Sequence, residues 1–100
     1  MGPNGRIAEK ASEDASEKKL RRDMGRRIAK ARTEQNMSQT KLARKLGIDR
    51  SRLSKWERGL HAPLLQQLVA LAQALSLSLD HLLTGEGLPW SPPPVRRSAA

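Results

Sequence analysis

The sequence predicts an all-α fold of five short helices packed into one small domain. Between residues 20 and 83, apolar side chains recur every three or four positions, which is the spacing of helices with one buried face. Glycines and residues that cap helices separate these apolar segments. One hundred residues without cysteine support one packed unit, held together by apolar contacts and helix caps rather than by disulfides.

The first helix is predicted over residues 20–35. Leu20, Met24 and Ile28 recur every four residues, so they share one face of this helix. Gly25 lies on the same helix and, because it has no side chain, allows a neighbouring element to approach closely. This helix is therefore expected to pack against the rest of the domain.

Two terminal segments flank the predicted domain, which covers residues 20–85. Residues 1–19 are polar and alternate in charge, so we expect a flexible arm or a frayed extension of the first helix. Residues 86–100 contain four prolines and no apolar period, so we expect an extended tail with polyproline character.

Two short helices are predicted on either side of Gly47. Ser38 offers an N-cap oxygen to the first, over residues 39–46, and Asp49 does the same for the second, over residues 50–58. Glycine at the point between them permits the sharp turn that such a pair needs.

The second of these helices has two different sides and ends at Gly59. At 100° per residue, Leu53 and Trp56 fall on the inner side, where they can join the core. The outer side is polar and basic, and it carries Ser51, Ser54, Lys55 and Arg58.

The last two helices are rich in leucine. Pro63 is expected to open a helix over residues 64–75, because proline suits the first turn of a helix. Ser78 is expected to cap a short fifth helix that ends at Gly85.

Charge is concentrated in the middle of the chain. Its 19 Lys and Arg against 10 Asp and Glu give a net charge of +9. Residues 21–62 hold 13 Lys and Arg against 4 Asp and Glu, whereas residues 1–20 and 63–100 are each balanced. A polyanion is the natural partner. Because Trp56 and Trp90 are the only aromatic residues, the chain lacks the stacking platforms of most single-strand and RNA-binding modules, which favours duplex DNA.

Several basic residues lie where a helix normally prefers acids. Arg50 and Arg52 occupy the first turn of one short helix, and Lys41 occupies the first turn of the other. The helix dipole disfavours cations there by roughly 0.3–1 kcal/mol each. A basic run alone can be a solvated helix face, but the glycine turn and the phase of the apolar residues favour phosphate binding.

Other functional classes find little support. Neither Ser51 nor Ser54 has an adjacent histidine that suggests a nucleophile and base, and no glycine-rich phosphate loop occurs, so we expect no catalytic residue, no cofactor and no enzyme. His61 and His81 are 20 residues apart without cysteine or paired carboxylates, so no metal site is expected. The chain has no apolar run for a signal peptide or a membrane span. We expect a cytoplasmic, nucleoid-associated protein.

Residues 37–59 resemble the helix-turn-helix of the phage-repressor type, also called the XRE or Cro/C1 family. The segments SQTKLARKLGI, WERG and ALSLSLDHLL occur in the expected order, and residues 25–85 cover the usual five-helix, lambda-repressor-like DNA-binding domain. Two positions depart from the pattern: Lys41 stands where many members have an acid, and Ser76 where a glycine commonly ends the fourth helix.

The resemblance implies a set of site residues. The helix over residues 50–58 is expected to enter the major groove and to read bases through Arg50, Ser51 and Lys55, with Ser54 close by. Gln39 matches a position that contacts phosphate and supports the reading helix, and Arg32 and Glu57 match a partly buried structural ion pair. From the residues themselves, further contacts to the DNA backbone are expected from Lys41, Arg44, Arg52, Arg58 and His61.

The function predicted from these features is a sequence-specific double-stranded DNA-binding transcriptional regulator. One short helix reads only a few base pairs, so we expect a homodimer on a roughly palindromic operator. Its contact surface is expected on the last two helices or at residues 88–90. An alternative is an antitoxin-type autoregulator that also binds a protein partner through the N-terminal arm or the C-terminal tail. A third is an architectural protein that recognises DNA by charge alone.

Overall fold

The chain folds into five α-helices, which confirms the predicted all-α class. In the computed structural model, the backbone is described for residues 3–86 and the side chains for residues 15–86, and no strand occurs in this part of the chain. The Pro-rich segment beyond residue 86 lies outside the described residues. The helices are α1 (Pro3–Glu34), α2 (Gln39–Leu46), α3 (Arg50–Glu57), α4 (Leu65–Leu75) and α5 (Leu79–Thr84).

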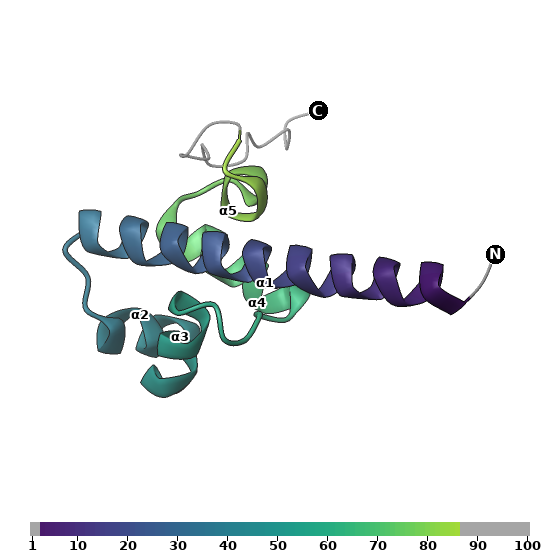
Figure 1. Cartoon of the computed structure of the whole chain (residues 1–100). Helices are drawn as coiled ribbons and strands as arrows, with labels where there is room; N and C mark the ends of the chain where they lie inside the picture. The colour runs from purple at the N-terminus through teal and green to yellow at the C-terminus, as the bar shows by residue number, and fades with distance from the viewer. Residues whose placement is uncertain (1–2, 87–100) are drawn as a thin grey trace, which may run out of the picture.

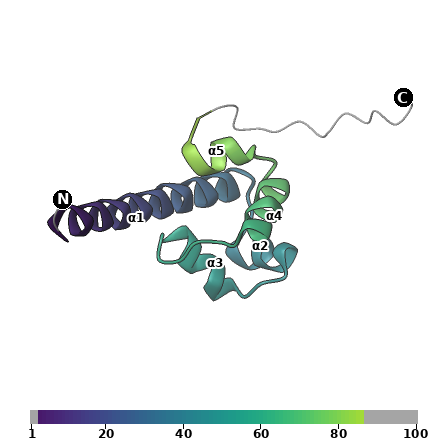
Figure 2. The ribbon, with the colours of Figure 1, turned by 90° about the vertical axis from the view of Figure 1, so that its right-hand side faces the viewer.

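Helix α1 is the support on which the other helices pack. It contacts α3, α4 and α5, with α5 on one side of it and α2 and α3 on the other (Figure 1). Its N-terminal part projects beyond the domain (Figure 2). The helix begins well before residue 20, where the apolar pattern predicted its start. Side chains four residues apart, such as Lys19 and Asp23 at 3.0 Å, form ion pairs that stabilise an exposed helix without apolar contacts.

The core contains at least one side chain from each helix. Ile28 of α1, Leu42 of α2 and Leu53 of α3 are each 0% exposed. The C-terminal helices contribute further fully buried residues, namely Leu71, Leu75 and Leu82. Because interiors are densely packed, these contacts fix the orientations of α2 and α3 relative to α1.

Three leucines of the predicted apolar faces lie outside this core. Leu20 is 47% exposed, Leu64 is 63% exposed and Leu65 is 76% exposed. Leu64 precedes the first turn of α4 and Leu65 begins it, so both lie at the N-terminal end of the helix. Leu65 lies on α4, as the helix predicted over residues 64–75 requires, whereas Leu64 precedes it, and no element of the described chain buries either side chain.

The helix ends follow the capping residues with one exception. Ser38 Oγ accepts a hydrogen bond from Lys41 N, and Ser78 Oγ accepts one from His81 N, each at 3.0 Å. Asp49 occupies the N-cap position of α3, but its side chain makes no capping hydrogen bond. Two predicted caps are therefore formed, and the third is present in position only.

Two non-glycine residues adopt left-handed backbone conformations at helix ends. Asn36, two residues after the end of α1, has φ 55°, and Ser76 at the end of α4 has φ 54°. Helix α4 begins two residues after Pro63, and the Leu64 amide donates to Gln67 Oε1 at 2.8 Å. Gln67 thus supplies one half of a capping box, and Leu64, which has no polar side-chain atom, cannot accept the reciprocal hydrogen bond from the Gln67 amide.

Candidate nucleic-acid interface

Helices α2 and α3 form a compact pair joined by a tight turn. Gly47 has φ 68°, and the amide of Ile48 donates to the Ala43 carbonyl oxygen at 3.0 Å, which closes the end of α2. Leu53 and Trp56 of α3 are buried, at 0% and 2% exposed. With the inner side of α3 committed to the core, the outer side faces solvent.

The predicted base-reading residues lie on that outer side. Arg50, Ser51 and Lys55 are exposed, whereas Ser54 is half-buried. Three of the four side chains can therefore reach a ligand lying along α3, and Ser54 is the least accessible. The contacts of these side chains with bases stay predictions.

The residues predicted to contact phosphates divide into two groups. The cations and the histidine are all exposed, and they are Lys41, Arg44, Arg52, Arg58 and His61. Gln39, in contrast, is half-buried, and its Nε2 donates to Glu57 Oε1 at 2.9 Å. The amide of Gln39 is thus engaged in holding the start of α2 to the end of α3.

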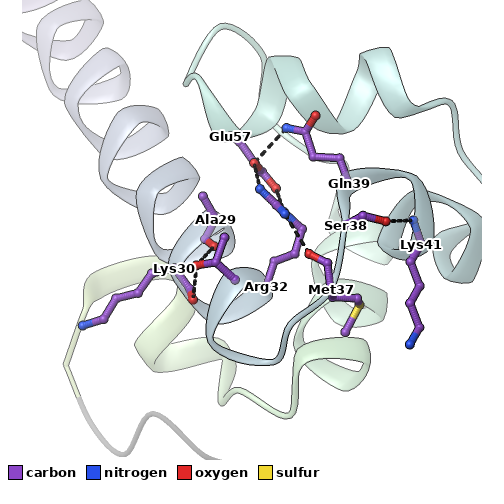
Figure 3. A network of polar contacts seen from close by, with 9 residues as sticks. Ala29, Lys30, Arg32, Met37, Ser38, Gln39, Lys41 and Glu57 are labelled. Carbon is purple, nitrogen blue, oxygen red and sulfur yellow. Dashed lines mark hydrogen bonds and ion pairs between the residues drawn. The ribbon is translucent and has the colours of Figure 1, made fainter.

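A partly buried polar network joins three helices behind the outer face (Figure 3). Arg32 Nε donates to Glu57 Oε2 at 2.7 Å and Arg32 Nη2 donates to Glu57 Oε1 at 3.0 Å, which makes a bidentate ion pair. The two side chains are 13% and 6% exposed. Arg32 Nη1 also donates to the Met37 carbonyl oxygen at 2.8 Å. The network ties the end of α1 to the start of α2 and to the last residue of α3.

Two glycines let α1 and the end of α3 approach each other. A Cβ atom on Gly25 would lie 2.5 Å from the Glu57 carbonyl oxygen, and one on Gly59 would lie 2.7 Å from Arg22 Cα. Real Cβ atoms essentially never approach so closely, so both positions require glycine for this packing. The orientation of α3 is therefore set at its C-terminal end by backbone contact with α1.

Arg22 is a basic residue at this contact that the sequence reasoning missed. It is exposed and packs through its backbone and Cγ against Gly59, directly after α3. The signal that could have found it is its place one helical turn before Gly25, where close approach was expected.

The cations of α1 and those of α2 and α3 differ in their partners. On α1, Asp23 pairs with both Lys19 and Arg26, and the hydrogen bond from Lys19 lowers the pKa of the Asp23 carboxyl. Within the described part of the chain, no carboxylate lies in ion-pair range of the exposed cations of α2 and α3, which are Lys41, Arg44, Lys45, Arg50, Arg52 and Lys55. The field of the outer face is therefore positive and unneutralised.

Comparisons with known proteins agree with this geometry. A family model described as "Helix-turn-helix" matches residues 28–82, which are more than half of the chain. The chain is 33% identical over 66 residues to the HTH-type transcriptional activator BcrR of Enterococcus faecalis, with 66% of this chain and 32% of BcrR covered. It is 36% identical over 63 residues to Repressor protein C2 of Salmonella phage P22, with 63% and 29% covered.

Two solved structures of such proteins contain DNA. The P22 c2 repressor in complex with a synthetic operator matches with a TM-score of 0.61 at 36% identity, covering 63% of this chain and 96% of that chain. SinR in complex with DNA, described as the master regulator for biofilm formation, matches with a TM-score of 0.56 at 38% identity, covering 60% and 97%.

The comparisons also delimit what is shared. The chain spans about a third of the length of BcrR and of Repressor protein C2. Most of α1 precedes the matched residues 28–82. Of the described helices, none combines the length and the apolar character needed to cross a membrane.

Proposed function

This chain belongs to the helix-turn-helix family of the XRE, or Cro/C1, type, and from that premise we propose that it is a sequence-specific transcriptional regulator of double-stranded DNA. Its α3 enters the major groove and reads base edges. The first turns of α2 and α3, with their free amides and added cations, bind the phosphates on either side. It has no catalytic role and acts in the cytoplasm, associated with the nucleoid.

One observation carries this proposal: the outer face of α3 presents unpaired donors, while its inner face is locked into the core. Arg50 and Lys55 are exposed and have the donors to reach guanine O6 and N7, and Ser51 can donate or accept at several base edges. Arg32, Glu57 and Gln39 hold α3 from behind, so its side chains meet DNA in a fixed register.

The operator is expected to be a rough palindrome read by two copies. A single α3 contacts only a few base pairs, and two half-sites one helical turn apart give the selectivity that a regulator needs. The antitoxin alternative is not favoured, because the matched relatives bear the names of transcriptional regulators and repressors.

Selection of bound sites from random duplexes, followed by titrations at two salt concentrations, tests the proposal. We expect an enriched motif with half-site symmetry. In Arg50→Ala and Lys55→Ala, preference for that motif over a scrambled duplex should fall by about 1–3 kcal/mol for each lost bidentate contact, or roughly 5- to 150-fold.

Lys30→Ala is the matched control, because it removes one exposed cation from α1. Lys30 lies beside α5 rather than beside α3. It should leave the preference between duplexes unchanged. Equal, fully salt-sensitive binding of the wild-type chain to every duplex would contradict sequence-specific recognition and favour an architectural protein that recognises charge alone.

A further inference from the structure

The cations of α1 differ in whether another group of the protein already engages them. Of the Lys and Arg residues of α1 whose side chains are described, most make an ion pair or a hydrogen bond, and these are Lys19, Arg21, Arg26, Arg27 and Arg32. Lys18, Arg22 and Lys30 are exposed, and within the described part of the chain no carboxylate lies in ion-pair range of them. An exposed cation without a partner is available to an external anion.

Two of these three cations lie on the side of α1 that faces the end of α3. Gly25 of α1 lies against the carbonyl oxygen of Glu57, and Arg22 lies against Gly59. At 100° per residue, Lys18 is rotated by only about 20° from Gly25 around the helix axis, whereas Lys30 is rotated by about 140°. Lys30 accordingly lines the groove beside α5. We call Lys18 and Arg22 the α1 basic pair.

The α1 basic pair continues the positive face of α3. Arg58, an exposed residue that caps the C-terminal end of α3, directly precedes Gly59, and Gly59 meets the backbone and Cγ of Arg22. From this contact α1 runs on toward its N-terminus and projects beyond the domain (Figure 2). Lys18 lies on this projecting side, one helical turn or about 6 Å from Arg22. The positive surface therefore extends from the reading helix onto α1.

Helix stability does not explain the α1 basic pair. Lys18, Arg22 and Arg26 follow one another at intervals of four residues, which places like charges next to each other on α1. Each such pair destabilises an isolated helix by about 0.2–0.5 kcal/mol, whereas a pair of opposite charge such as Lys19 and Asp23 stabilises it. A local rule that is broken without an apolar gain points to a function of the residues that break it.

We propose that Lys18 and Arg22 bind phosphates of the duplex that flanks the bases read by α3. This inference rests on the proposed DNA-binding function and extends the interface to residues that precede the matched residues 28–82. Phosphate contacts carry no sequence information directly, so the α1 basic pair adds affinity and salt dependence without preference among flanking sequences.

The test compares Lys18→Gln and Arg22→Gln with Lys30→Gln. Each variant lowers the net charge of the chain by one, and glutamine has nearly the helix propensity of lysine and arginine. In Arg22→Gln, the Cβ and Cγ atoms that lie beside Gly59 are kept. Affinity is measured over a range of salt concentrations on two duplexes. One carries the selected site with long flanks, and the other is trimmed to the bases that α3 reads.

On the flanked duplex, Lys18→Gln and Arg22→Gln should each reduce the slope of log affinity against log salt by about 0.9. A four-fold rise in salt should then weaken binding by each variant about 3.5-fold less than it weakens binding by the wild-type chain. Lys30→Gln should keep the wild-type slope. On the trimmed duplex, the wild-type chain and all three variants should share one slope, because the flanking phosphates are absent.

Two outcomes would overturn the proposal. One is a wild-type slope on the flanked duplex in both Lys18→Gln and Arg22→Gln. The other is an equal reduction in Lys30→Gln, which would indicate a general effect of net charge. Should Arg22→Gln disturb the packing against Gly59, Lys18→Gln still decides the question, because Lys18 makes no such contact with a described glycine.

Failure of the proposed function has a different signature. A wild-type chain without preference among duplexes would contradict sequence-specific recognition. Slopes reduced in Lys18→Gln and Arg22→Gln, but not in Lys30→Gln, would even then show that the α1 basic pair binds phosphates.

Discussion

Two consecutive segments of equal length have opposite chemistry. Residues 38–58, which contain α2 and α3, include nine charged residues among 21, whereas residues 59–79, which contain α4, include none. Both segments contribute fully buried leucines, Leu42 and Leu53 in the first and Leu71 and Leu75 in the second. The core therefore uses both segments alike, and the difference lies in what each presents to solvent.

That difference shows how a domain this small separates two surfaces. In α2 and α3, cations occupy first turns where the helix dipole opposes them, and a buried network holds the pair in place from behind. In α4, no ionic contact is made; apolar packing holds the helix, together with the hydrogen bond that Gln35 Nε2 donates to the Leu75 carbonyl oxygen at 2.8 Å. The first segment gives up local stability for a positive face, and the second keeps a face on which like charges do not repel.

The largest expected effect tests whether the charged segment depends on its buried network. Glu57→Ala would leave the Arg32 guanidinium without its carboxylate and Gln39 without its acceptor. Removing one partner of a buried ion pair typically destabilises a protein by about 3–5 kcal/mol. We expect a decrease of that size in the free energy of unfolding, measured by urea denaturation.

Glu34→Ala is the control for this prediction, because it removes an exposed carboxylate at the end of α1. A surface substitution of this kind usually changes stability by about 0.5 kcal/mol or less. Equal losses in Glu57→Ala and Glu34→Ala would show that the network does not hold α3, and the contrast between the two segments would lose its physical basis.

A smaller effect is expected in the uncharged segment, at the end of α4. Ser76 has φ 54°, a conformation that is unfavourable by about 1–2 kcal/mol for a residue with a Cβ atom. Ser76→Gly relieves this strain. It also raises the conformational entropy of the unfolded chain, which lowers the stability gained by about 0.4–1 kcal/mol. We expect a net stabilisation of about 0.5–1 kcal/mol by thermal or urea unfolding.

Asn36→Gly is the matched variant, because Asn36 has nearly the same φ of 55° at the end of α1. Asparagine tolerates the left-handed region better than serine, so its replacement should stabilise the domain less. If Asn36→Gly stabilised the domain more than Ser76→Gly, relief of backbone strain would not account for the effect of the substitution at position 76.

Local rules made much of this fold predictable. Ser38 and Gly47 act at short range, through a cap and a left-handed turn, so sequence alone located the boundaries of α2. The ion pair of Arg32 and Glu57 joins positions 25 residues apart, and it was expected only through the family resemblance. The base-reading roles on α3 stay predictions, since they depend on a ligand that the sequence does not contain.

Features that depend on tertiary neighbours were not predictable. The sequence predicted a leucine-rich helix over residues 64–75, but the exposure of Leu64 and Leu65 depends on whether another helix reaches that end of α4. Arg22 meets Gly59 across 37 positions of sequence, and the close approach expected at Gly25 indicates this part of α1 but not the partner that contacts it. The early start of α1 has a local cause instead: the segment before residue 20 carries no apolar pattern, so its sequence left both a flexible arm and a helical extension open, while ion pairs between side chains four residues apart support helix.

The smallest expected effect sharpens the contrast, because one substitution should move stability and DNA affinity in opposite directions. Lys41 is the third residue of α2, and its amide is already capped by Ser38 Oγ. Glutamate there complements the helix dipole and can complete a capping box with the Ser38 amide, so Lys41→Glu should stabilise the domain by about 0.3–1 kcal/mol. It should also weaken DNA binding, with the slope of log affinity against log salt reduced by about 0.9 for the lost phosphate contact.

Lys45→Glu makes the same change in charge in the last turn of α2, where the dipole favours a cation. It should therefore lower stability, so the two variants should shift the unfolding midpoint in opposite directions while the net charge of the chain changes equally in both. Shifts of the same sign would mean that overall charge repulsion, rather than the position of each cation on its helix, governs the stability of this segment. In that case Lys41 would not lower the stability of α2 through the helix dipole. DNA binding would then not be needed to explain why a cation occupies this first turn.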